Sequence, residues 1–105
     1  MNVRLAENEI RFRVSNEEFQ ALIAREPIRL DSEFINVVVQ ISQTVFSDGL
    51  RLDFSSRDLK LLLSPDEVKV LETRLPSKKG IETRVITTSG KELNIIFEVD
   101  LKNKL

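Results

Sequence analysis

The stretch that decides the fold is residues 2–18, which read NVRLAENEIRFRVSNEE. Apolar side chains stand at every second position over residues 2–6 and 9–14, which is the period of a strand with one face on a core. Glu7 and Asn8 separate the two runs and have the composition of a tight turn. The sequence therefore predicts a hairpin whose inner face carries Val3, Leu5, Ile10, Phe12 and Val14.

The start of a helix follows this hairpin directly. Ser15 and Glu18 have the spacing of a capping box, in which the serine oxygen accepts the N–H three residues on and the glutamate reaches back. Pro27 predicts where the helix ends, because a proline disfavours helical geometry in the residue before it.

The same pattern occurs again 49 residues later. Ser64 and Glu67 form a second predicted capping box, and Pro65 occupies the first helical position. Pro76 predicts the end of this second helix, as Pro27 does for the first. Strands predicted over 50–54 and 58–63 precede this helix, which we place at 65–75. We therefore predict a pseudo-repeat of approximately residues 1–46 and 50–101 within a single domain, 1–105.

Four further strands complete the predicted architecture, over residues 28–30, 34–45, 81–87 and 92–101. Each half then has the order strand, strand, helix, strand, strand. The predicted fold class is α+β, an antiparallel sheet with two helices packed on its apolar face.

Composition restricts the chemistry that the chain can perform. The 105 residues include no Cys, His, Trp or Tyr, which excludes disulfides, thiol chemistry and imidazole acid–base catalysis. No metal site and no cofactor are expected. The net charge of −1 argues against a nucleic-acid partner, and the absence of a long apolar run argues against a membrane partner. The sequence predicts a cytoplasmic protein.

Both ends of the chain resemble a family of short bacterial proteins with a domain of unknown function. Members of that family open with a Met-x-Ile-Arg-Ile-x-x-Asn-x-Ile-Arg-x-Arg-Leu-Thr type of segment, to which residues 1–15 are similar. The resemblance extends to the closing hairpin around Gly90 and Leu93. It implies no activity, and the polar positions that match are Arg4, Asn8, Arg11, Arg13, Glu98 and Asp100.

Five of these residues form the candidate binding face. Strand alternation places Arg4, Arg11 and Arg13 on the outer face of the sheet, with Glu98 and Asp100 on the same face of the closing strand. Three guanidiniums could bind an anion, such as phosphate or a carboxylate, or the face of a partner. Alternatively, the two carboxylates pair with the arginines in a structural ion-pair lattice. We expect at least two of the three arginines to be paired with carboxylates.

Four apolar residues fall on the outer side of their predicted strands: Phe34, Val38, Leu62 and Ile96. They suggest a homodimer or a protein partner that covers an outer sheet face, or a sheet that closes into a barrel. The predicted function is a non-enzymatic interaction or ligand-binding module with no catalytic residues. The alternative is an enzyme for an anionic or phosphorylated small molecule, held by the arginines, with Glu98 or Asp100 as base.

Overall fold

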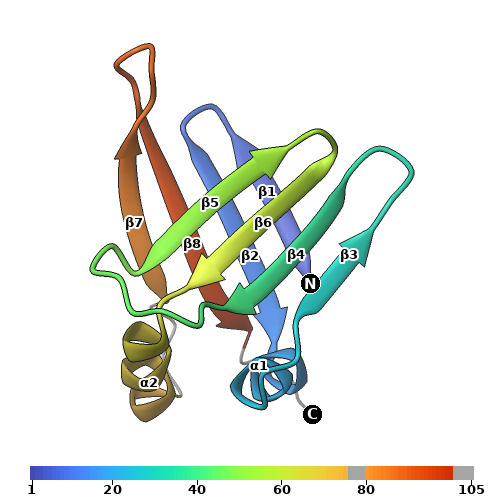
Figure 1. The fold of residues 1–105 in the computed structure, drawn as a ribbon, viewed down its shortest axis with the longest axis vertical. Coiled ribbons are helices and arrows are strands. Elements are labelled where there is room, and N and C mark those ends of the chain that lie inside the picture. Colours follow the sequence, from blue (N-terminus) through green and yellow to red (C-terminus); the bar gives the residue numbers. More distant parts are fainter. Residues whose placement is uncertain (76–79, 101–105) are drawn as a thin grey trace.

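The computed structural model describes residues 1–75 and 80–100. Figure 1 shows two sheets that cross each other and two helices at one end of the molecule. The elements, in chain order, are β1 (Asn2–Ala6), β2 (Glu9–Ser15), α1 (Asn16–Ile23), β3 (Ile28–Asp31), β4 (Asn36–Ile41), β5 (Leu50–Ser55), β6 (Asp58–Leu63), α2 (Pro65–Arg74), β7 (Ile81–Ile86) and β8 (Glu92–Asp100).

Each sheet has four strands and takes one hairpin from each half of the chain. The first sheet has the order β1-β2-β8-β7, and the second has the order β3-β4-β6-β5. The hairpins are antiparallel, but the central pairs, β2 with β8 and β4 with β6, are parallel. The fold is therefore α+β as predicted, whereas the prediction of a purely antiparallel sheet was wrong. Helices α1 and α2 lead the chain from one sheet to the other, so hairpins from different halves meet side by side.

The register of the two halves agrees with the repeat. Asn2 pairs with Arg13 in the first hairpin, and Arg51 pairs with Leu62 in the equivalent hairpin. The predicted turn at residues 7 and 8 is present between β1 and β2. Both halves also have the predicted element order. These agreements support a two-half repeat.

The core lies between the two sheets. Phe12, Phe97, Val39 and Leu61 project from central strands and are almost completely buried. The sequence suggested that the helices pack on the apolar face of a single sheet, and this prediction was wrong. Instead they close one end of the space between the sheets (Figure 1). Phe19 of α1 packs there against Phe97, with ring centroids 6.4 Å apart.

One of the two predicted capping boxes is present. The Ser15 hydroxyl accepts the Glu18 N–H at 3.0 Å, and the Glu18 carboxylate accepts the Ser15 N–H at 2.9 Å. The same carboxylate accepts the Met1 ammonium at 2.9 Å. Burial by itself raises the pKa of Glu18, but these hydrogen bonds outweigh it and the pKa lies below its ordinary value.

The capping box predicted at Ser64 is not formed. The Ser64 carbonyl accepts the Val68 N–H, but its buried hydroxyl makes no hydrogen bond within the described residues. The Ser64 N–H donates instead to the Gly49 carbonyl at 2.9 Å. It is therefore not available to the Glu67 carboxylate, which would accept it in a capping box. Pro65 nevertheless begins the helix, as predicted.

The predicted strand at 34–45 is shorter in the structure, where β4 covers Asn36–Ile41. The Ser32 hydroxyl accepts the N–H groups of Phe34 and Ile35 and holds them in a turn. At the other end, the Ser42 hydroxyl accepts the Thr44 N–H. Serine side chains thus terminate the strand at both ends by competing for its backbone donors. In the described part of the chain, no helix combines the length and the apolar character that crossing a bilayer requires.

Candidate functional site

The outer face of the first sheet brings three of the five predicted site residues together. The Glu98 carboxylate accepts from the Arg11 Nη1 at 3.1 Å with one oxygen and from the Arg13 Nε at 3.1 Å with the other. Arg11 and Arg13 are neighbours of Glu98 because β2 and β8 run in parallel, and Arg13 is its direct register partner. The expected pairing of two arginines with carboxylates is present.

This cluster is partly shielded from water. The Glu98 side chain is 11% exposed, against 32% for Arg11 and 39% for Arg13. Arg11 also donates to Glu9 at 3.2 Å. The hydrogen bonds to Glu9 and Glu98 raise the pKa of Arg11 above its ordinary value. Both oxygens of the Glu98 carboxylate therefore accept from guanidinium groups.

A glycine allows the neighbouring strand to approach Glu98. A Cβ atom at Gly80 would overlap the carbonyl oxygen of Phe97 and crowd the Cα of Glu98. Because a larger residue would push β7 away from β8, Gly80 helps to keep this part of the sheet closed.

The other two predicted site residues lie outside this cluster. Arg4 is the register partner of Arg11 on the edge strand β1, where it is exposed. It makes no ion pair with any described residue. Asp100 lies beside Ser15 at the end of β8 and is half-buried. The three arginines thus share a face, but among the described residues only Arg11 and Arg13 are ion-paired with Glu98.

A second surface feature lies at the end of the molecule opposite the helices. All four edge strands have an inward apolar residue near their hairpin turns that is much more exposed than the core: Leu5 (74%), Phe54 (62%), Leu30 (39%) and Val85 (37%). Their register partners, Ile10, Leu59, Val37 and Leu93, belong to the apolar core or pack against it. We call these four residues and the four hairpin turns the open end.

Exposure increases along each edge strand toward the open end. On β5 it rises from 1% at Leu50, next to the helices, to 62% at Phe54. On β3 it rises from 8% at Ile28 to 39% at Leu30. The inner faces of the sheets are therefore covered near the helices and increasingly accessible toward the turns.

Sequence reasoning placed Leu5 in the core and did not identify the open end. Alternation correctly put Leu5 on the inner face, but it carries no information on whether the opposite sheet covers that position. The available signal was the repeat, in which Leu5 and Phe54 occupy equivalent positions next to a hairpin turn.

The four apolar residues expected on an outer face do not form one patch. Val38 and Leu62 are half-buried on the second sheet, Ile96 lies on the first sheet, and Phe34 lies in the turn between β3 and β4. Elsewhere, a surface hollow of about 730 Å³ lies between the end of α1 and the start of α2 and includes Arg25 and Lys69. Among the described residues, no group of three or more acidic side chains is arranged to hold a metal ion.

These features define a small α+β domain of two mixed sheets with a charged outer face and an apolar open end. Residues 1–103 match the model of a family of unknown function, DUF7009, and the chain belongs to that family. This agrees with the resemblance to an uncharacterised family. No curated protein and no solved structure matches the chain.

Proposed function

We propose that this protein is a non-enzymatic interaction module that binds an apolar part of a partner at its open end. The observation that carries the proposal is the exposure of inward apolar residues on all four edge strands. Soluble proteins seldom leave such side chains grouped at one end, and grouped apolar surface commonly marks a binding site. In the described part of the chain, six of the eight large exposed apolar residues belong to this end of the molecule; they are Leu5, Leu30, Phe34, Phe54, Val85 and Ile86.

The charged outer face gives less support to the alternative of an enzyme for an anionic small molecule. A phosphate that approached Arg11 or Arg13 would compete with Glu98, which already holds both guanidiniums at 3.1 Å. We propose that these three residues mainly stabilise the first sheet and that Arg4 remains for a contact with a partner. A phosphate titration tests this: it should raise the melting temperature of the wild type no more than that of Arg11→Ala.

A neutral apolar dye, Nile red, tests the main proposal without interference from charge. The wild type should bind the dye saturably, and the double variant Leu5→Ser with Phe54→Ser should weaken binding by about ten-fold. Val70→Ser is the matched control, because Val70 is 49% exposed on α2. Circular dichroism confirms that each variant is folded.

The control should bind the dye as the wild type does. The proposal is wrong if the double variant binds the dye normally, or if Val70→Ser weakens binding as much as the double variant does.

A further inference from the structure

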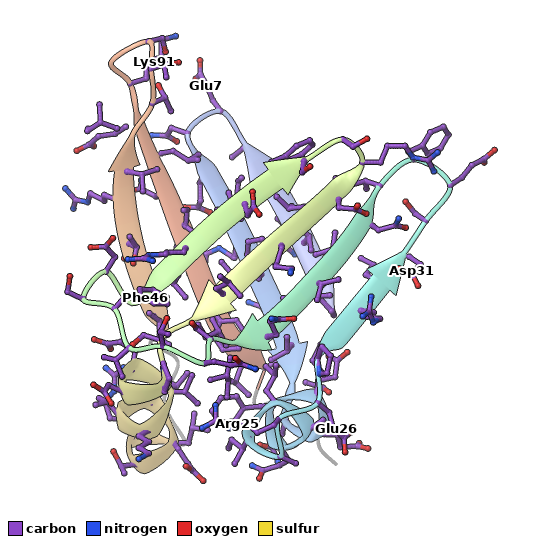
Figure 2. The ribbon with its side chains drawn as sticks, in the orientation of Figure 1. Glu7, Arg25, Glu26, Asp31, Phe46 and Lys91 are labelled. Atoms are coloured by element: carbon purple, nitrogen blue, oxygen red, sulfur yellow. The ribbon has the colours of Figure 1, made fainter. Side chains whose placement is uncertain are left out.

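The turns that surround the open end are acidic. The four hairpin turns, each taken with one flanking residue on either side, contain six acidic and two basic residues. This gives a charge of −4, although the whole chain carries only −1. Figure 2 shows Glu7 and Lys91 at this end of the molecule, and Arg25 and Glu26 at the end with the helices. The hairpin turns at the open end therefore carry more negative charge than the chain as a whole.

Several of these acidic residues have no cationic partner. Glu9 pairs with Arg11, and Glu92 pairs weakly with Arg84 at 3.8 Å. Glu7, Asp31 and Glu33 make no ion pair with any described residue. A partner that carries cationic groups could pair with these carboxylates.

The shape of the open end favours an extended occupant. Its four exposed inward residues lie on four different edge strands, two in each sheet, so an occupant that contacts them all must bridge the two sheets. An extended segment of about seven residues spans roughly 23 Å, which is comparable with the shorter dimensions of the molecule, 32 and 26 Å. The edge strands also have one side free of a described neighbouring strand, where an extended chain could pair its backbone.

From these observations we infer that the partner of the open end is an extended protein segment in which apolar side chains alternate with lysine or arginine. This inference rests on the proposed function and adds the chemistry of the partner. The apolar side chains would contact Leu5 and Phe54, and the basic side chains would lie near Glu7, Asp31 and Glu33. An anionic membrane surface fits less well, because the acidic turns would repel it.

Two labelled peptides of equal length test the inference by fluorescence anisotropy. One alternates lysine with leucine and phenylalanine, and the other has glutamate in place of lysine. The wild type should bind the lysine peptide about ten-fold more tightly than the glutamate peptide at low salt. In the variant Glu7→Lys with Glu33→Lys, the preference should disappear or reverse.

A matched control carries the same change of charge elsewhere. Glu26→Lys with Glu72→Lys alters two exposed residues near or on the helices. It should keep the preference for the lysine peptide within about two-fold of the wild type. Loss of the preference in this control would show that net charge alone determines binding, and would overturn the inference.

Failure of the inference and failure of the proposed function give different results. If both peptides bind equally and Leu5→Ser with Phe54→Ser weakens both, the open end binds apolar groups but the inferred charge preference is wrong. If that double variant leaves both affinities unchanged, the proposed function is wrong. Two further results would overturn the inference: tighter binding to phosphatidylserine vesicles than to the lysine peptide, or a dimer in light scattering that Phe54→Ser dissociates.

Discussion

Replacing Glu98 by glutamine removes one negative charge from between two arginines while keeping the size of the side chain. Glu98 accepts Arg11 with one oxygen and Arg13 with the other, so the single amide oxygen of glutamine can keep one of these hydrogen bonds while its NH2 group faces the other guanidinium. A buried charged hydrogen bond contributes about 1.5–3 kcal/mol, whereas an exposed ion pair contributes about 0–1 kcal/mol. Because the arginines are about one-third exposed, we expect a value near 1 kcal/mol for each bond.

Glu98→Gln should therefore lower the free energy of unfolding by about 1–2 kcal/mol. For a domain of this size, that corresponds to a fall in melting temperature of roughly 5–10 °C. Urea unfolding at neutral pH measures the free energy directly, provided that the slope of the transition is unchanged.

Glu92→Gln is the matched control, because it removes the carboxylate of a largely exposed pair with Arg84. This control should change stability by less than about 0.5 kcal/mol. A double-mutant cycle with Arg13→Gln then isolates the coupling between Arg13 and Glu98, which we expect to be about 0.5–1.5 kcal/mol. The reasoning is refuted if Glu98→Gln is no more destabilising than Glu92→Gln, since Glu98 would then not hold the arginines.

Four further substitutions test local features of the backbone. Ser15→Ala should lower the free energy of unfolding, measured in urea, by about 1 kcal/mol. Ser64→Ala should change it little or increase it, because the buried Ser64 hydroxyl has no hydrogen-bond partner among the described residues. Equal losses in the two variants would contradict this reasoning. Gly80→Ala should be destabilised by more than about 2 kcal/mol or fail to fold, since the added Cβ overlaps the Phe97 carbonyl, and a stable variant would show that β7 can move. Arg25 has a positive φ of 69°, so Arg25→Gly should increase the free energy of unfolding by about 0.5–1 kcal/mol and raise the melting temperature. A lower melting temperature would show that the arginine side chain itself is stabilising.

Alternation in the sequence predicts the core well because it reports which side of a strand is apolar. Phe12 and Val14 were both expected to point inward, and both are buried. Alternation does not specify which strand lies beside which. The parallel pairing of β2 with β8 joins residues such as Glu9 and Asn94, which are far apart in the sequence, and no local signal predicts it.

The candidate site was predictable to a similar extent. Arg11, Arg13 and Glu98 share an outer face by strand period alone, and their ion pairs follow once β2 and β8 are neighbours. That Arg4 makes no ion pair with a described residue was not predictable, because it depends on the position of β1 at the edge of the sheet. The exposure of Leu5 also depends on the edge position of β1 and was not predictable. Because leucine is apolar, the sequence suggested instead that this side chain is buried.

The exchange of hairpins between the sheets has a consequence for the order in which the protein can be assembled. All strands of the second sheet have been synthesised once the chain reaches Leu63, so that sheet can form early. The first sheet cannot be completed until β8 has been made, because β8 is a central strand between β2 and β7. During synthesis the backbone edge of β2 that pairs with β8 therefore stays unpaired until β8 has been made. A truncation that removes β8 would take away the middle of a sheet, whereas chain ends in most domains can be shortened with little loss.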